Sequence, residues 1–197
     1  MALTDKDILI TPNDGSSTAD PKINYVGANS SSSDTITVET LFDGTKATLS
    51  FEGSAGQLFS IVNDLSSDPI FSVNDVSGVP SIEVNSNGNI SLAEFSGNVG
   101  IGTSSPETKL HVFKGESGGA AANTDSSLVL ENNSHTYVQF LTPTNKESGL
   151  LFGDNDNDNA ALTYSHSTNN MTFRAAGANR MTLVGSSGNL GIGTTSP

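Results

Sequence analysis

The residues most able to bind a ligand are the alternating acids and amides of Asp154–Asn159. Carboxylates spaced two residues apart suit calcium, which takes about six to eight oxygen ligands. An EF-hand loop would need glycine in place of Asn159 and glutamate in place of Ser165. This mismatch favours a polar hairpin tip, with calcium binding as the alternative, and we assign no metal ligand.

The histidines are His111, His135 and His166, and the chain has no cysteine. His111 lies between Leu110 and Val112, so on a strand it points to the face opposite this apolar pair. We expect the histidines on the surface, with burial at a contact between chains as the alternative. No Ser-His-Asp grouping lies in a recognisable motif, so nucleophilic catalysis has no support. We predict no catalytic residue.

Two further patterns resemble ligand sites. The glycine-rich run 97–102 lacks the following helix that a dinucleotide fingerprint requires, so we predict no cofactor. Phe51, Phe59 and Phe71 could stack on the sugar rings of a receptor. Each lies on the apolar side of an expected strand, however, which favours packing in a core.

Charge and composition exclude several classes of function. The 197 residues carry a net charge of −13, and no Lys or Arg occurs between positions 47 and 108. A nucleic-acid site needs the opposite sign, so we predict no nucleic-acid partner and read the acids as a solvated surface. No apolar stretch approaches the roughly 20 residues of a membrane helix, and we expect no membrane insertion and no signal peptide.

The elements that position these residues are short strands. SGNVGIGTSSP at Ser96–Pro106 returns as SGNLGIGTTSP at Ser187–Pro197, which is an internal repeat. Apolar residues two apart alternate with turn-forming clusters, and this predicts an all-β architecture. The expected strands contain Ile8–Ile10, Ile23–Val26, Ile36/Val38, Leu49/Phe51, Phe59/Ile61, Phe71/Val73, Ile82/Val84, Ile90/Leu92, Val99/Ile101, Leu110/Val112, Leu128/Leu130, Val138/Phe140, Leu150/Phe152, Leu162/Tyr164, Met171/Phe173, Met181/Leu183 and Leu190/Ile192.

Each unit is too small to be stable alone. Only 34% of the residues are hydrophobic, and a unit offers two or three inward side chains against its ordering entropy. We therefore expect an elongated, repetitive architecture of short strands in which chains pair their edges and bury their apolar residues together. An intertwined homotrimer, a triple-stranded β-helix or prism-like shaft, meets both needs. A right-handed monomeric β-solenoid is the competing solution.

Several segments resemble the tail fibres of tailed bacteriophages, especially marine phages. SGNVGIGTSSPETKLHV at Ser96–Val112 resembles their repeat, and LFSIVNDLSSDPIFSVNDVSGVPSIEVNSNGNISL at Leu58–Leu92 is similar to their shaft segments. LLFGDNDNDNAALTYSHSTNNMTFRAAGANRMTL at Leu150–Leu183 is similar to modules usually followed there by another GIGTTSP. DKDILITPN at Asp5–Asn13 looks like their virion-proximal start.

The resemblance implies a homotrimeric virion fibre, made in the cytoplasm of the host bacterium and built into the phage tail. Residues 1–34 would attach it to other tail proteins, 35–113 would form a repetitive β shaft, and 114–197 a second β module ending in the GIGT repeat. The fibre would position a distal part that binds the host receptor. Because the first repeat runs on into Glu107–Val112 whereas the second stops at Pro197, we expect this to be the N-terminal portion of a longer fibre.

Three other functions stay open at this point. A head or neck fibre would have the same fold class at another place on the virion. A polysaccharide depolymerase on a β-helix would need paired acidic residues in a groove. A bacterial surface adhesin would need an export signal. We expect a structural protein and no enzyme.

Overall fold

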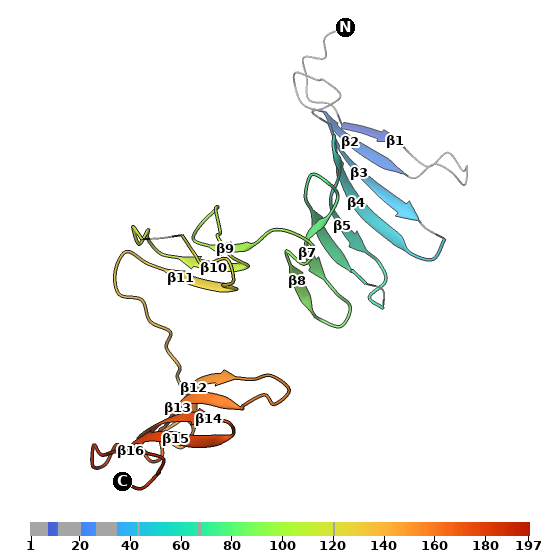
Figure 1. Ribbon diagram of the computed structural model, residues 1–197. Helices are drawn as coiled ribbons and strands as arrows, with labels where there is room; N and C mark the ends of the chain where they lie inside the picture. Colours follow the sequence, from blue (N-terminus) through green and yellow to red (C-terminus); the bar gives the residue numbers. More distant parts are fainter. Residues whose placement is uncertain (1–7, 12–20, 27–34, 43, 67, 120) are drawn as a thin grey trace. The chain divides into compact units, whose positions relative to one another are not determined.

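The computed structural model consists of short β-strands joined by turns (Figure 1). It describes residues 8–11, 21–26, 35–42, 44–66, 68–119 and 121–197, and among these no residue is helical. The chain divides into two compact units, Met1–His135 and Thr136–Pro197. The predicted all-β class is confirmed. Two segments whose composition predicts connections, the loop 12–17 and the run of four serines at 30–33, lie outside the described residues.

An eight-stranded antiparallel sheet forms the first part of the chain, with neighbouring strands in chain order (Figure 1). Its strands are β1 Ile8–Thr11, β2 Lys22–Val26, β3 Thr35–Phe42, β4 Ala47–Gly53, β5 Gly56–Val62, β6 Phe71–Asn74, β7 Pro80–Val84 and β8 Ile90–Leu92. Turn residues set these boundaries: Gly78 and Gly88 adopt φ of +80° and +85°, which glycine reaches without steric cost.

The register of this sheet separates apolar from polar side chains. Strict alternation places one row of apolar residues across seven strands, and the next row, one residue along, is polar. The apolar row is Ile23, Val38, Phe51, Phe59, Val73, Ile82 and Leu92. The polar row is Lys22, Glu39, Ser50, Ser60, Ser72, Glu83 and Ser91. The two faces of the sheet therefore differ in chemistry from β2 to β8.

A three-stranded parallel sheet follows, in the order β11–β10–β9. Its strands are β9 Val99–Ile101, β10 Leu110–Phe113 and β11 Leu128–Glu131. The first GIGT repeat supplies β9. The predicted segment boundary after residue 113 falls inside this sheet, because β11 pairs with β10 across the intervening loop. The three predicted segments stay predictions.

A five-stranded antiparallel sheet, again in chain order, makes up the second unit (Figure 1). Its strands are β12 Glu147–Phe152, β13 Ala160–Ser165, β14 Asn170–Ala175, β15 Ala178–Leu183 and β16 Leu190–Ile192. An apolar row consists of Leu150, Leu162, Phe173, Met181 and Ile192. The neighbouring row on the other face is Gly149, Thr163, Thr172, Thr182 and Gly191.

One predicted strand is wrong. Val138 and Phe140 lie in a segment without strand structure, and Tyr137 and Leu141 beside them are each 82% exposed. A strand requires a neighbour that pairs with its N–H and C=O groups, and in the described structure none pairs with this segment. The apolar spacing alone therefore did not make a strand. The remaining predicted strands are confirmed.

Candidate functional site

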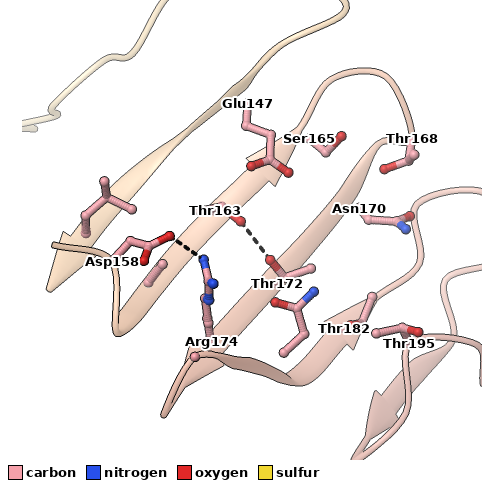
Figure 2. A pocket seen from close by; sticks show the side chains of 14 residues that line it. Glu147, Asp158, Thr163, Ser165, Thr168, Asn170, Thr172, Arg174, Thr182 and Thr195 are labelled. Atoms are coloured by element: carbon pink, nitrogen blue, oxygen red, sulfur yellow. Dashed lines mark hydrogen bonds and ion pairs between the residues drawn. The ribbon is translucent and has the colours of Figure 1, made fainter. Parts of the chain in front are cut away.

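A polar groove runs along one face of the five-stranded sheet and has a volume of about 850 Å³. Figure 2 places its labelled side chains on one side of the strands, as their alternation requires. Thr163, Thr172 and Thr182 form its middle row, and Thr195 reaches it from the turn after β16. Six of the 14 residues that line the groove are serine or threonine, so hydroxyl groups are its most frequent polar groups.

Some of the polar groups that line the groove bond one another, and one buried hydroxyl does not. The Thr163 and Thr172 hydroxyl oxygens lie 2.7 Å apart and share a hydrogen bond, and Arg174 Nη1 lies 2.7 Å from Asp158 Oδ2 (Figure 2). Thr182 is 2% exposed, and its Oγ1 has no hydrogen-bond partner in the described part of the chain. Thr182 thus keeps a buried, unsatisfied polar atom in the groove.

The groove has the composition of a binding surface. Its charged residues are Glu147, Asp158 and Arg174, and the described residues that line it include no His, Lys or Cys. In the described contacts the Asp158 carboxylate pairs with Arg174, and the Thr163 hydroxyl bonds that of Thr172, so these groups are engaged with other partners and not in a nucleophile–base pair. Hydroxyl and amide groups can instead exchange hydrogen bonds with a polar ligand.

The acidic run Asp154–Asn159 lies in the turn between β12 and β13, as the predicted hairpin tip requires. Asp154 Oδ1 accepts the N–H of Asp156 at 3.0 Å, and Asp156 Oδ1 accepts the N–H of Asp158 at 3.3 Å. The Asp158 carboxylate pairs with Arg174. Within the described residues no three acidic, His or Cys side chains are grouped as for a metal ion. The calcium alternative stays untested.

His111 contradicts the prediction of an exposed ring. It is 2% exposed, its Nε2 lies 3.2 Å from Glu131 Oε2, and its Nδ1 accepts the N–H of Glu107 at 3.4 Å. Phe113 packs edge-on against the ring at 5.9 Å between centroids. The side chain does face away from the apolar pair, as predicted, but that face is covered because Glu107 and Glu131 contact the ring from outside β10.

The other two histidines differ from each other. His135 is exposed, as predicted. His166 is half-buried, since its ring meets Tyr164 edge-on at 4.9 Å and its Nε2 lies 3.5 Å from Ser148 Oγ. His111 and His135 belong to the first unit and His166 to the second.

Glu131 joins His111 to a serine. Ser117 donates its backbone N–H to Oε1 at 2.7 Å and its hydroxyl to the same atom at 3.0 Å. These two hydrogen bonds, with a smaller contribution from His111, hold the pKa of Glu131 below its usual value. The carboxylate lies in the middle of this trio, whereas a nucleophilic triad needs histidine in the middle. The arrangement therefore stabilises a loop and does not activate Ser117.

Two turns of the eight-stranded sheet are stabilised by the same pair of hydrogen bonds, from a serine to the aspartate two residues before it. Asp64 accepts the N–H of Ser66 at 2.8 Å and its hydroxyl at 2.6 Å, and Asp75 does the same with Ser77. The Ser66 hydroxyl and then its N–H lower the pKa of Asp64, and the same groups of Ser77 lower that of Asp75. The pKa of Asp68 is lowered mainly by the N–H of Ser86.

The three phenylalanines proposed as sugar platforms contact one another. Phe51 stacks on Phe59 with centroids 4.0 Å apart, and Phe59 meets Phe71 at 6.4 Å. All three belong to the apolar face of the eight-stranded sheet and are half-buried there. Their contacts agree with packing, as predicted.

Sequence reasoning did not predict that, within a single chain, the polar face of each sheet is the more buried one and the apolar face the more exposed one. Small polar residues are buried, namely Ser50, Ser60 and Ser72. The opposite face stays open, with Ile61 47% exposed and Leu150 of the five-stranded sheet 48% exposed. We call these surfaces, which carry the two apolar rows given above and their apolar neighbours, the two apolar faces. The sequence signal that could have indicated a buried polar face is the recurrence of Ser or Thr at matching positions of successive strands.

Comparison with family models, with curated proteins and with solved structures found no match.

Proposed function

We propose that this chain forms the base and shaft of a bacteriophage tail fibre, as a homotrimer whose role is mechanical and positional. The observation that carries the proposal is the exposure of the apolar face of the eight-stranded sheet. Soluble monomers rarely expose a continuous apolar patch of more than a few hundred Å². A further copy of the chain is the partner we propose for this face.

Several features support self-assembly over a small-molecule site. Ile36, Leu49, Ile61, Ile90 and Leu92 lie on one face and are each at least 40% exposed. Stacked rings such as Phe51 and Phe59 can extend across an interface between copies. The resemblance of the sequence to phage tail fibres is the basis for choosing three copies and a virion location.

The remaining parts of the proposal follow the same resemblance. Residues 1–34, of which β1 and β2 are described, attach the fibre to other tail proteins. A distal part contacts the host receptor, and the fibre itself has no catalytic role. No helix among the described residues is long and apolar enough to cross a membrane. A head or neck fibre is the alternative, and locating the protein in intact particles by electron microscopy distinguishes the two.

The proposal is tested by the mass of the full chain in solution. Sedimentation equilibrium should give three times the chain mass of 20.3 kDa. Phe71→Ala should weaken the trimer by about 3–5 kcal/mol per chain if the ring is fully buried on assembly. A folded, concentration-independent monomer would contradict the homotrimer.

A further inference from the structure

The buried ring of His111 lies between two glutamates that come from opposite sides of β10 in the sequence. The backbone N–H of Glu107, in the connection between β9 and β10, donates to Nδ1 at 3.4 Å. Oε2 of Glu131, on β11, lies 3.2 Å from Nε2. The ring is 2% exposed, and Phe113 meets it edge-on, so these contacts fix which way each ring nitrogen points.

The same contacts determine which nitrogen carries the proton of the neutral ring. Because Nδ1 accepts an N–H, the proton lies on Nε2, towards the Glu131 carboxylate. A second proton can therefore be added only at Nδ1, where it would meet the N–H of Glu107. Two donors cannot form a hydrogen bond with each other, so protonation of His111 removes this contact, whereas the contact with Glu131 becomes an ion pair.

Glu107 also holds the segment that leads into β11. Its Oε2 accepts the backbone N–H of Ala122 at 2.6 Å. Both Glu107 and His111 line one cavity of about 310 Å³, and the other ionisable groups that line it are Glu116 and Glu131. No Lys or Arg is among the described residues that line this cavity. A positive charge added to the ring would therefore have carboxylates, and no cation, around the cavity beside it.

We propose that Glu107 is an acid-released latch on the segment 121–127, with His111 as its sensor. The change begins when the ring binds one proton from solvent at Nδ1 and becomes a donor on the side where Glu107 lies; no covalent bond changes. The Glu107 carboxylate then leaves the N–H of Ala122 and accepts the imidazolium N–H, because a charged donor adds an attraction that a backbone N–H lacks. Ala122 is thereby released.

The rest of the connection between β10 and β11 keeps its described contacts in this mechanism. Oε1 of Glu131 keeps the N–H of Ser117 at 2.7 Å and its hydroxyl at 3.0 Å, since this carboxylate gains attraction from the charged ring. The carbonyl of Ser127 keeps the N–H of Leu110 at 3.0 Å, at the start of β11. The latch therefore frees the chain near Ala122 and leaves β11 paired.

The test records NMR spectra of the full ¹³C,¹⁵N-labelled chain from pH 8 to pH 5, the range in which histidines change charge and carboxylates ordinarily do not. The Ala122 amide should shift with the same midpoint as the His111 ring. Its exchange protection, corrected for the pH dependence of free amides, should fall at least about fivefold, as the loss of one hydrogen bond predicts. Ser117 and Leu110 should keep their protection. A ring that stays neutral to pH 5, or one that titrates while Ala122 stays protected, would overturn the latch.

Three variants separate the latch from a general loosening in acid. Glu107→Gln keeps an oxygen that can accept the N–H of Ala122 but no charge for the imidazolium to attract, so Ala122 should stay protected at pH 5. His111→Gln removes the titrating ring and should abolish the pH dependence of Ala122. His135→Gln, at an exposed histidine of the same unit, should behave like the parent. Release of Ala122 at pH 5 in Glu107→Gln would overturn the proposal, and this variant decides alone if His111→Gln loses its structure already at pH 8.

Discussion

The eight-stranded and five-stranded sheets have the same arrangement of faces and differ in how their polar face is completed. In the eight-stranded sheet the buried hydroxyls are paired: Ser60 and Ser72 share a hydrogen bond at 3.0 Å, and Gln57 donates to Ser50 at 2.7 Å. In the five-stranded sheet the Thr182 side chain is among those that line the groove, and its buried Oγ1 has no hydrogen-bond partner among the described residues. Alternation thus determines which face is polar, whereas the side chains of neighbouring strands determine whether that face is closed.

The largest predicted effect concerns the feature that the two sheets share. Ile61→Glu and Leu150→Glu each place a charge on one apolar face, at residues of nearly equal exposure, 47% and 48%. If both faces are buried between copies, each variant should dissociate the assembly, since an unpaired buried charge costs several kcal/mol. We expect the dissociation constant measured by sedimentation to rise at least about 100-fold for both.

A rise of the dissociation constant in only one of these two variants would show that the two apolar faces do not have the same role in assembly. Dissociation by Ile61→Glu alone would confine the interface to the eight-stranded sheet and leave the second apolar face without a role in assembly. A glutamate at Ser91, on the polar row, is the control for added charge and should leave the mass unchanged.

The second prediction compares how much a buried hydroxyl on the polar face of each sheet contributes to stability. Ser60→Ala leaves the buried Ser72 hydroxyl without its partner and should lower the free energy of unfolding by about 1–3 kcal/mol. Thr182→Val removes a hydroxyl that has no described partner and keeps the side-chain shape, so stability should be unchanged or higher. Urea unfolding should therefore show a loss of stability in Ser60→Ala and no loss in Thr182→Val. A loss of stability in Thr182→Val like that of Ser60→Ala would mean that Thr182 makes a hydrogen bond after all.

The sequence predicts where strands lie and which of their residues share a face, because alternation is a local property. Apolar pairs such as Phe59/Ile61 and Leu162/Tyr164 lie on strands where expected. Which strands pair is not local: Val138 and Phe140 have the same spacing, but no described strand pairs with their segment. The two GIGT copies make the point most directly, since nearly identical residues pair in parallel with β10 and antiparallel with β15.

The candidate site was predicted less well than the fold, for a related reason. The groove draws Glu147, Asp158 and Thr182 from three separate segments, and no sequence spacing brings them together. The burial of His111 likewise depends on Glu107 and Glu131, on either side of β10 in the sequence. The turn run Asp154–Asn159 was placed correctly because it needs only its own backbone.

The smallest predicted effect concerns acid, and it applies to the turns of the eight-stranded sheet. The pKa of Asp64 and of Asp75 is lower in the folded chain than the unfolded value of about 3.9. Their hydrogen bonds therefore contribute stability that is complete above that pH and is lost as the pH falls through the lower folded pKa. Stability should decline below about pH 4, and acid titration followed by circular dichroism measures this decline.

Removing the serine hydroxyls tests the cause of these shifts. In Ser66→Ala with Ser77→Ala, Asp64 and Asp75 keep the backbone N–H donors and lose the hydroxyl donors, which are the larger cause of each lowered pKa. Both pKa values should rise towards the unfolded value, and the acid transition should move to higher pH. Ser165→Ala in the five-stranded sheet is the matched control, because the Ser165 hydroxyl bonds the hydroxyl of Ser167 at 3.1 Å. If the acid transition of the double variant stays where it is in the parent, the serine hydroxyls do not set the acid response of this sheet.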